Sequence, residues 1–419
     1  MTCGPFERVA MIGLGYIGLP TAALMASRGL RVLGVDISPS VVETINSGGI
    51  HIVEPGLERL VADVVAAGTL RASCAPEASD AFLIAVPTPF KDDHAPDLSY
   101  VEAAARAIAP VLKRGDLVVL ESTSPVGSTE RLSGWLAEAR PDLRFPGTQA
   151  AADADVNIAY CPERVLPGRV IEELVSNDRV VGGLTPACAR RAAELYAAFV
   201  QGACHQTHAR TAEMCKLTEN AFRDVNIAFA NELSLICDEL SINVWELIRL
   251  ANRHPRVDIL QPGPGVGGHC IAVDPWFIVD SSPDRAKLIR QAREVNDGKP
   301  GWVVGRVRSE IARRGARRVA CLGLSFKPDI DDLRESPALE IVHALAQAEK
   351  GIEFLVAEPH IECLPPRLAG LGNVSLRPSV EAVDACDVVV MLVNHRAFAS
   401  ITKEDLAGRA VIDTRGQWQ

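Results

Sequence analysis

The sequence lacks the cysteine patterns of disulfide-rich secreted proteins and of zinc proteins. Its 11 cysteines are an odd number, with no Cys-x-x-Cys pair and no cluster with histidine at zinc-ligand spacing. It also lacks any uninterrupted apolar run of roughly 18 residues, which a transmembrane helix needs. A strand-like segment at Arg8–Gly13 leaves no room for a signal peptide. We therefore expect a cytoplasmic protein with reduced thiols, no metal and no membrane insertion.

Positive charge is in short supply. The chain has 43 Lys and Arg against 53 Asp and Glu, which gives a net charge of −10. This excess of acid argues against a nucleic-acid-binding protein, although a local basic pocket for an anionic small molecule stays open. The 419 residues are 48% hydrophobic and 23% charged, a composition typical of globular proteins, and the length fits about two to four domains.

Apolar segments of strand length alternate with helical patterns in two parts of the chain. In the first part these segments are Val9–Ile12, Val32–Val35, Phe82–Val86, Leu117–Leu120, Asn157–Tyr160 and Val180–Val181. In the second part they are Val319–Leu322, Glu353–Val356, Val388–Val393 and Val411–Asp413. A helical pattern over about 211–250 and a Gly- and Pro-rich stretch at Gln261–Pro275 lie between them. The sequence thus predicts an α/β protein with two Rossmann-like, doubly wound domains joined by a central helical domain with a long helix. The expected boundaries are 1–207, 208–300 and 301–419.

A glycine motif directly follows the first predicted strand and opens a helical stretch. It comprises Gly13, Gly15, Tyr16, Ile17 and Gly18 in the pattern Gly-x-Gly-x-x-Gly. Glycines permit a tight turn and a close approach to a pyrophosphate, and Asp36 at the end of the next strand can accept hydrogen bonds from ribose hydroxyls. Because a carboxylate there disfavours a 2′-phosphate, the motif predicts NAD as cofactor. Thr88 and Thr129 follow two later strands and are further candidates for cofactor contacts, although either hydroxyl could equally belong to a turn or a helix cap.

Two further motifs carry residues suited to oxidation chemistry. Glu213, Lys216, Asn220 and Arg223 follow one another at offsets of three, four and three in the long helical pattern. The apolar residues around them indicate burial, and a buried lysine can act in acid–base catalysis. Cys270 lies in the segment Gly263–Pro275, two residues after the glycine-rich loop Gly263–Gly268 and four residues before Asp274. That neighbourhood gives the thiol access to a ligand as a nucleophile, whereas His269 is interpreted as structural.

Taken together, these motifs resemble the UDP-glucose/GDP-mannose dehydrogenase family over essentially the whole chain. The resemblance includes Tyr160–Gly168, Ala212–Asn220, Asn252–Arg256, Gly263–Phe277, Gly323–Pro328 and Asp331–Pro337. Ser325 stands where alanine is common in the family. The resemblance implies an NAD-binding domain, a helical dimerisation domain and a domain that holds the UDP part of a nucleotide sugar. It also implies a four-electron oxidation of a sugar CH2OH group to a carboxylate with two NAD.

The resemblance assigns roles residue by residue. Lys216 assists proton transfer, Cys270 forms a thiohemiacetal and then a thioester, Asn220 and Asp274 support them, and Glu163 aids hydrolysis. Arg334 joins the residues that contact NAD. The residues expected to contact the substrate are Arg164, Val165, Lys216, Asn220, Arg223, His254, Arg256, Gly267, Phe326, Lys327 and Arg415.

Within the family, the motifs indicate UDP-N-acetyl-D-mannosamine as substrate and a homodimer as the assembly. UDP-N-acetylglucosamine and UDP-glucose are the alternative substrates. A two-electron β-hydroxyacid dehydrogenase also has a Lys-x-x-x-Asn pair, but it gives no role to Cys270 or to the second α/β domain. A non-catalytic nucleotide-sugar sensor is the third interpretation, which the intact Lys216, Cys270 and Asp274 disfavour.

Overall fold

The computed structural model describes residues 6–91, 94–147, 154–166, 168–268 and 271–418. The chain divides into two compact units, Met1–Glu219 and Asn220–Gln419, each of which is described by itself. The helix α8 (Ala209–Glu239) begins in the first unit and ends in the second. No helix in the described part of the chain combines the length and the apolar character that crossing a bilayer requires.

The first unit is built on an eight-stranded sheet with the order β3-β2-β1-β4-β5-β6-β7-β8. Its strands are β1 (Arg8–Ile12), β2 (Arg31–Val35), β3 (Leu70–Ser73), β4 (Ala81–Ile84), β5 (Leu117–Leu120), β6 (Asn157–Tyr160), β7 (Arg179–Gly183) and β8 (Cys204–His208). Its helices before α8 are α1 (Gly18–Ser27), α2 (Pro39–Asn46), α3 (Leu57–Ala66), α4 (Ser99–Ile108), α5 (Ser128–Ala139), α6 (Val170–Ser176) and α7 (Pro186–Tyr196). A short 3₁₀ turn, η2 (Ala109–Val111), follows α4.

The second unit is built on a five-stranded parallel sheet with the order β11-β10-β9-β12-β13. Its strands are β9 (Arg318–Leu322), β10 (Glu353–Ala357), β11 (Val374–Leu376), β12 (Val388–Met391) and β13 (Ala410–Asp413). Its helices after α8 are α9 (Val244–Ala251), α10 (Asp274–Ser281), α11 (Lys287–Arg314), α12 (Pro337–Ala348), α13 (Pro366–Ala369) and α14 (Ser379–Ala385), with a 3₁₀ turn, η4 (Arg396–Phe398).

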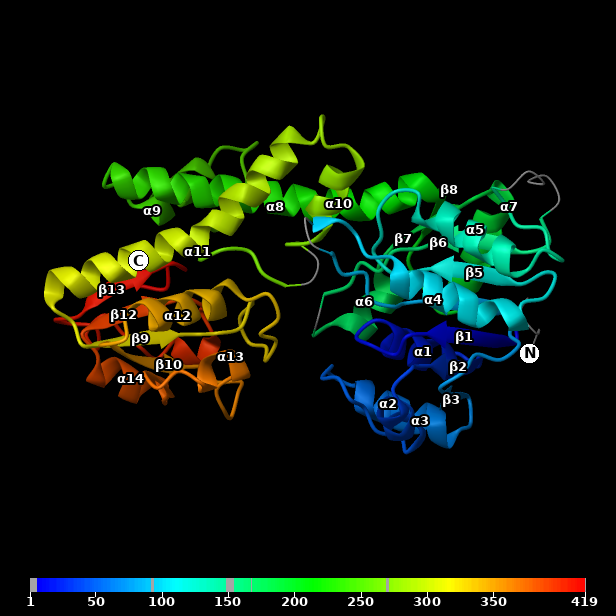
Figure 1. The fold of residues 1–419 in the computed structure, drawn as a ribbon, viewed down its shortest axis with the longest axis horizontal. Coiled ribbons are helices and arrows are strands. Elements are labelled where there is room, and N and C mark those ends of the chain that lie inside the picture. The colour runs from blue at the N-terminus through cyan, green and yellow to red at the C-terminus, as the bar shows by residue number, and fades with distance from the viewer. Residues whose placement is uncertain (1–5, 92–93, 148–153, 167, 269–270, 419) are drawn as a thin grey trace. The chain divides into compact units, whose positions relative to one another are not determined.

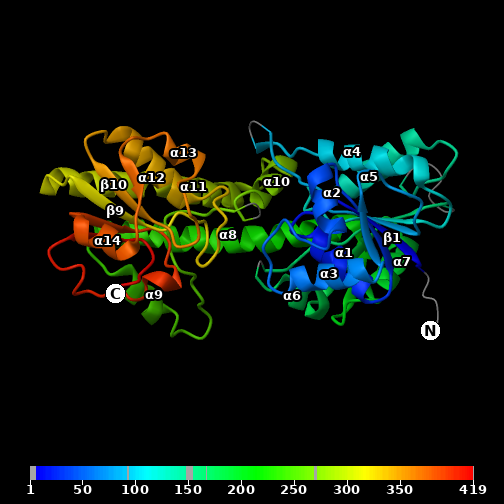
Figure 2. The ribbon, with the colours of Figure 1, turned by 90° about the horizontal axis from the view of Figure 1, so that it is seen from below.

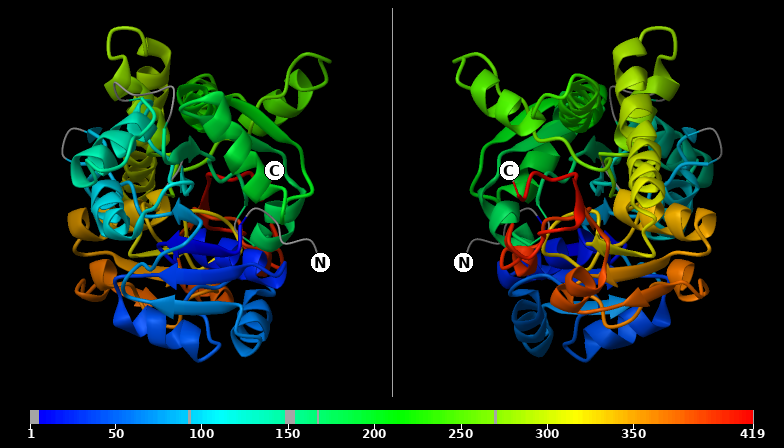
Figure 3. Two further views of the ribbon diagram at one scale, coloured as in Figure 1. Left: turned by 90° about the vertical axis from the view of Figure 1, so that its right-hand side faces the viewer. Right: turned by 90° about the vertical axis from the view of Figure 1, so that its left-hand side faces the viewer.

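Helices cover both faces of each sheet (Figures 1 and 2). In the first unit, alternate strand residues pack against α1, α3, α6 and α7 on one face and against α4 and α5 on the other. In the second unit, α11 and α12 cover one face, and α14 covers the other. The layers of each unit can also be followed in Figure 3. The central strands are buried on both faces, which explains their continuous apolar sequences. The predicted fold class is therefore confirmed.

The structure differs from the sequence-based prediction in three details. The strands β3, β8 and β11 were not predicted, because their partly exposed sequences lack an apolar run. The pair β6 and β7 is antiparallel, whereas the prediction was a parallel sheet. The helical pattern over 211–250 is two helices rather than one. Ser241 has a φ of 55° between them, and the Asn243 side chain caps α9 by accepting from the N–H groups of Trp245 and Glu246.

Candidate active site

The glycine motif forms the turn between β1 and α1 at the carboxyl end of the first sheet. Gly13 has a φ of 93°, and a Cβ atom there would lie 2.5 Å from the carbonyl oxygen of Ala85. Only glycine fits such a turn. The partly exposed Asp36 accepts hydrogen bonds from the N–H groups of Leu14 at 3.0 Å and Ser38 at 3.0 Å. Gly15 has open space around its Cα. The turn therefore has the cradle and the carboxylate that a dinucleotide requires.

The second unit has a similar glycine turn directly after β9, and a carboxylate directly after β10 binds it. Gly323 has a φ of 94°, and Glu358 accepts from the N–H groups of Leu324 at 2.7 Å and Ser325 at 3.1 Å. Glu358 is buried and also lies 3.0 Å from Nε2 of the buried His395. The Ser325 hydroxyl donates to the carbonyl of Lys327 at 2.7 Å, which gives this serine a local role that alanine cannot fill.

Asp329, His360 and His395 are a group of side chains, among the described residues, whose ligand atoms lie within 4.8 Å of one another. The Asp329 N–H donates to His395 Nδ1 at 3.0 Å, and the opposite ring nitrogen faces the Glu358 carboxylate. Nδ1 is therefore an acceptor and Nε2 a donor. Because neither nitrogen of His395 offers a lone pair to a metal, we interpret the group as an anchor for the loop after β9.

The two threonines expected near NAD follow β4 and β5. The Thr88 hydroxyl donates to the carbonyl of Thr123 at 2.6 Å. Thr129 is buried, and its hydroxyl donates to Glu213 at 2.6 Å. Glu213 also accepts from the N–H groups of Gly127 and Thr129 at the start of α5, where the helix dipole favours an anion. Sequence reasoning gave Glu213 no role, although the structure makes it the anchor of the loop after β5.

Glu163 and Arg164 follow β6, and both are held by ion pairs. The Glu163 carboxylate accepts from Arg179 at 2.6 Å and from the N–H of Arg164 at 2.6 Å. The side chains of Arg179 and Glu163 are only 2% and 7% exposed. Arg164 pairs with Glu219 at 2.6 Å, and Val165 beside it is partly buried. The structure thus fixes this segment by charge pairs that its sequence alone does not reveal.

The residues predicted on the long helix differ in burial. Asn220 is buried, Lys216 is partly buried and Arg223 is exposed. Of the apolar neighbours that indicated burial, Met214, Phe222 and Phe229 are exposed. The expected burial is therefore confirmed for Asn220, Leu217 and Ala221 but not for Arg223 or for these three large side chains, which lie on an exposed face of α8.

Asn220 and Asp274 are in direct contact within the second unit. The Asn220 amide donates a short hydrogen bond to the Asp274 carboxylate, and both side chains are buried. Asp274 is the first residue of α10, where a carboxylate is favoured by the helix dipole. The sequence singled out both residues, and the structure brings them together.

The glycine-rich loop packs closely on other parts of the second unit. A Cβ atom at Gly267 would lie 2.3 Å from the Glu335 carbonyl oxygen and 2.9 Å from Phe326 Cβ. A Cβ at Gly263 would lie 2.6 Å from an Arg415 Nη atom. The structure therefore places Gly267, Phe326 and Arg415 around one loop. Cys270 and His269, which follow it, lie outside the described residues.

The other predicted residues lie nearer the surface. His254 and Arg256 are exposed in the segment after α9. Arg334 is exposed and pairs with Asp332 at 2.6 Å, while Lys327 is partly buried. A cavity of about 480 Å³ also borders the loop, with Gly263, Lys299, Trp302 and Thr414 among its lining residues.

Three parts of the chain match the three domains of one protein family. Residues 7–200 match the NAD binding domain of the UDP-glucose/GDP-mannose dehydrogenase family. Residues 210–298 match its central domain and residues 320–419 match its UDP binding domain. The chain belongs to this family. The glycine turn and Asp36 fit NAD, which is the cofactor of this dehydrogenase.

Relatives within the family carry two kinds of name. The chain is 62% identical to the UDP-N-acetyl-D-mannosamine dehydrogenase of Yersinia pestis, covering 99% of this chain and 100% of that protein. It is also 62% identical to an NDP-N-acetyl-D-galactosaminuronic acid dehydrogenase of Ralstonia nicotianae, covering 99% and 96%. Among solved structures, a UDP-D-ManNAc dehydrogenase from Pyrococcus horikoshii is 38% identical, with a TM-score of 0.87 and coverage of 98% and 96%.

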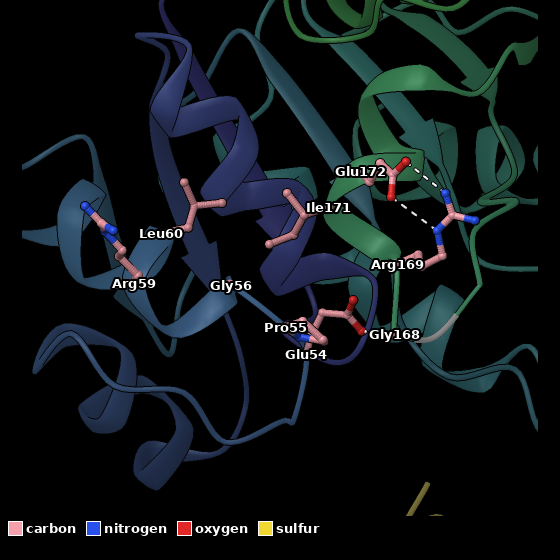
Figure 4. A pocket seen from close by; sticks show the side chains of 9 residues that line it. All are labelled: Glu54, Pro55, Gly56, Arg59, Leu60, Gly168, Arg169, Ile171 and Glu172. Carbon is pink, nitrogen blue, oxygen red and sulfur yellow. Dashed lines mark hydrogen bonds and ion pairs between the residues drawn. The ribbon is translucent and has the colours of Figure 1, made fainter. Parts of the chain in front are cut away.

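A cavity of about 530 Å³ in the first unit has none of the predicted site residues among its lining residues (Figure 4). Glu54 and Gly168 are on its wall, as is the exposed ion pair between Arg169 and Glu172. Glu54 accepts from the N–H groups of Gly168 at 2.9 Å and Val170 at 2.8 Å. We interpret Glu54 as an anchor for the segment that follows Arg164 and Val165.

Glu121, at the carboxyl end of β5, is expected to make stability depend on pH. It is buried, and one of its carboxylate oxygens accepts from the Tyr196 hydroxyl at 2.6 Å while the other has no partner. Burial raises the pKa of Glu121 from 4.5 to about 7, against a smaller opposing effect of the Tyr196 hydrogen bond. Because the unfolded carboxyl loses its proton first, this group lowers stability as the pH rises from about 4.5 to about 7. The loss levels off above that pH at about 3 kcal/mol.

Glu121→Gln should therefore raise the thermal midpoint at pH 8 by a few degrees, because glutamine keeps an acceptor for Tyr196 and carries no charge. Near pH 4 the variant and the wild type should unfold at the same temperature. Differential scanning calorimetry at both pH values checks this, and an equal difference at both would show that Glu121 does not titrate as inferred.

Proposed function

We propose that this dehydrogenase oxidises the C6 hydroxymethyl group of UDP-N-acetyl-D-mannosamine to a carboxylate. The observation that carries the mechanism is the buried hydrogen bond between Asn220 and Asp274. Asn220 follows Lys216 by four residues on α8, and Asp274 follows Cys270 by four residues. The contact thus ties the helix of the proposed base to the segment of the proposed nucleophile. The full-length identity to the Yersinia pestis enzyme supports the choice of sugar.

The proposed chemistry uses the chain's own groups in sequence. When bound, NAD accepts a hydride from C6. Lys216 assists the loss of the C6 hydroxyl proton, which yields an aldehyde. The Cys270 thiolate then adds to the aldehyde carbon and forms a thiohemiacetal. Loss of a second hydride, to a second NAD, gives a thioester, and water breaks its C–S bond to release the carboxylate and the thiol. Asn220 and Asp274 orient Lys216 and the attacking water, and Glu163 aids hydrolysis.

The remaining sequence-based assignments are part of the same proposal. We place the cofactor on the glycine turn, Asp36, Thr88, Thr129 and Arg334, and the UDP-sugar on the basic and loop residues that the family resemblance names. The domain boundaries 1–207, 208–300 and 301–419 are proposed as well, and the three family matches support them. The cytoplasmic location and the absence of metal and nucleic-acid ligands stay predictions.

We also propose a homodimer formed through α8. Phe222, Phe229 and Ile236 of α8 are 69%, 52% and 44% exposed and recur at steps of seven residues, and Leu240, directly after the helix, is 61% exposed. Such spacing keeps large apolar side chains on one helical face, which is typical of a protein interface. Light scattering of the purified protein measures the mass of the assembly.

A second candidate substrate is an N-acetyl-D-galactosamine nucleotide, because the Ralstonia nicotianae relative has the same identity of 62%. A panel of UDP-N-acetylmannosamine, UDP-N-acetylgalactosamine, UDP-N-acetylglucosamine and UDP-glucose separates the candidates. We expect the highest kcat/KM with UDP-N-acetylmannosamine. Each sugar should yield two NADH, measured by their absorbance. A higher kcat/KM with the galactosamine nucleotide would favour the second candidate, and one NADH per sugar would contradict the four-electron reaction.

A further inference from the structure

Four polar side chains are buried between α8 and α11 in the second unit. Asp224 and Asn231 on α8 are 0% exposed, and Arg293 and Asn296 on α11 are each 1% exposed. Buried polar groups destabilise a fold unless they find partners. Such a cluster therefore needs a reason beyond packing two helices, which apolar residues would do better.

The four side chains form a continuous chain of hydrogen bonds that ends on the glycine-rich loop. Arg293 pairs with Asp224 at 2.6 Å, and the Asn296 amide donates to the Asp224 carboxylate at 2.8 Å. The Asn231 amide donates to the Asn296 oxygen at 2.8 Å. The Asn231 oxygen accepts from the backbone N–H of Gly263 at 2.9 Å. These hydrogen bonds thus connect a buried ion pair to the first residue of the loop.

The groups at the two ends of this hydrogen-bond network fix the orientation of the Asn231 and Asn296 side-chain amides. The Asp224 carboxylate and its backbone carbonyl accept from Asn296 at 2.8 Å and 3.1 Å, so the Asn296 NH2 group must face Asp224. The Asn296 oxygen then faces Asn231. At the other end the Gly263 N–H can only donate, so the Asn231 oxygen must face it. An amide that is constrained on both sides holds its partner in one position.

The loop is restrained on its other side as well. The guanidinium of Arg415 lies so near Gly263 that a Cβ atom there would approach it to 2.6 Å. Gly263 is therefore held between Asn231 and Arg415, seven residues before Cys270. A restraint at this point limits where the rest of the loop can go.

We propose that Asn231 and Asn296 are positioning residues, which fix the start of the Gly263–Gly268 loop and thereby the approach of Cys270 to the substrate. The proposal rests on the proposed function, since it assigns Cys270 as the nucleophile. Neither asparagine touches the reacting atoms in this account. They act through the backbone N–H of Gly263.

The test replaces Asn231 by a side chain of similar volume that cannot form hydrogen bonds. Asn231→Leu leaves the Gly263 N–H and the Asn296 oxygen without their partner. We expect kcat to fall by about 100-fold with a smaller change in KM, because a displaced nucleophile slows chemistry more than binding. The rate at which iodoacetamide alkylates Cys270, followed by peptide mass spectrometry, should also change by at least about fivefold.

A conservative variant and a matched control accompany this measurement. Asn231→Asp keeps an acceptor for Gly263 and loses the donor to Asn296, so kcat should fall by only about three- to tenfold. Asn226→Ala removes an amide from the same helix that donates only locally, to the carbonyl of Phe222 at 2.7 Å. It should leave kcat and the alkylation rate unchanged.

The outcomes decide the proposal in each case. If both Asn231 variants keep kcat and the alkylation rate within twofold of the wild type, the network is only a folding device and the proposal is overturned. If Asn231→Leu does not fold, kcat and the alkylation rate of Asn231→Asp are compared with the wild type instead, and values within twofold overturn the proposal. If the wild type makes no NADH from any UDP-sugar, the proposed function fails, while the alkylation rates still test the placement of the loop.

Discussion

Cys270→Ala is expected to reduce turnover by at least about 10³-fold, because removal of a nucleophile eliminates the covalent path altogether. The wild type should yield two NADH and one carboxylate per sugar, with no free aldehyde, since the intermediate stays attached between the two hydride losses. NAD affinity should stay within twofold of the wild type, because the proposed cofactor turn lies in the first unit. Coupled measurement of NADH and of the sugar products checks all three quantities.

Cys270→Ser sharpens the same test. Serine is a far weaker nucleophile at neutral pH, and an oxygen ester is cleaved more slowly than a thioester. Turnover should therefore collapse, and a trapped adduct should add mass to the protein. Cys363→Ala is the matched control, since Cys363 is an exposed thiol of the same unit. Two NADH per sugar from Cys270→Ala at the wild-type rate would refute the covalent mechanism.

Glu163→Ala is expected to destabilise the first unit by about 3–5 kcal/mol, because it leaves the buried Arg179 guanidinium without its counter-charge. Among the described residues, Arg179 then keeps the carbonyl of Leu174 at 3.0 Å and a contact with the ring of Tyr196. Thermal and denaturant unfolding measure this loss. The double variant Glu163→Leu/Arg179→Met should recover most of it, since two apolar side chains of similar volume remove both charges together.

The exposed pair between Arg169 and Glu172 provides the comparison for this experiment. Its side chains are 60% and 65% exposed, so Glu172→Ala should change stability by no more than about 1 kcal/mol. Equal losses from Glu163→Ala and Glu172→Ala would mean that burial does not set the strength of the Arg179 pair. Activity of the double variant separately tests the proposed role of Glu163 in hydrolysis.

The sequence predicted the parts of the fold whose residues are buried on both faces. Strands such as β4 and β5 are continuous apolar runs, and their helices have clear periodicity. The strand β8 has the sequence Cys-His-Gln-Thr-His and is largely exposed, so nothing in its composition marks it as a strand. The break after α8 depends on one residue with positive φ, Ser241, in a stretch without proline or glycine.

The site shows a similar division. Residues within compact motifs, such as Asp36 and Asp274, could be named from local spacing. The roles of Glu213, Asn231 and Asn296 could not be assigned in this way, because their hydrogen-bond partners are far away in the chain. Glu213 and Thr129 are 84 residues apart, and Asn231 and Asn296 are 65 apart. A single sequence carries no pattern that pairs such residues before the helices are placed.

The two similar glycine turns raise the question of which nucleotide each unit binds. A glycine turn backed by a carboxylate is a general receptor for adenosine ribose, and each unit of this chain has one. In the first unit, Asp36 is partly exposed. In the second unit, the buried Glu358 carboxylate accepts hydrogen bonds from two backbone N–H groups and lies beside Nε2 of His395. Because Glu358 is buried and bonded to His395, its carboxylate is less accessible to a ribose hydroxyl than that of Asp36, so the two turns are unequal receptors for the coenzyme.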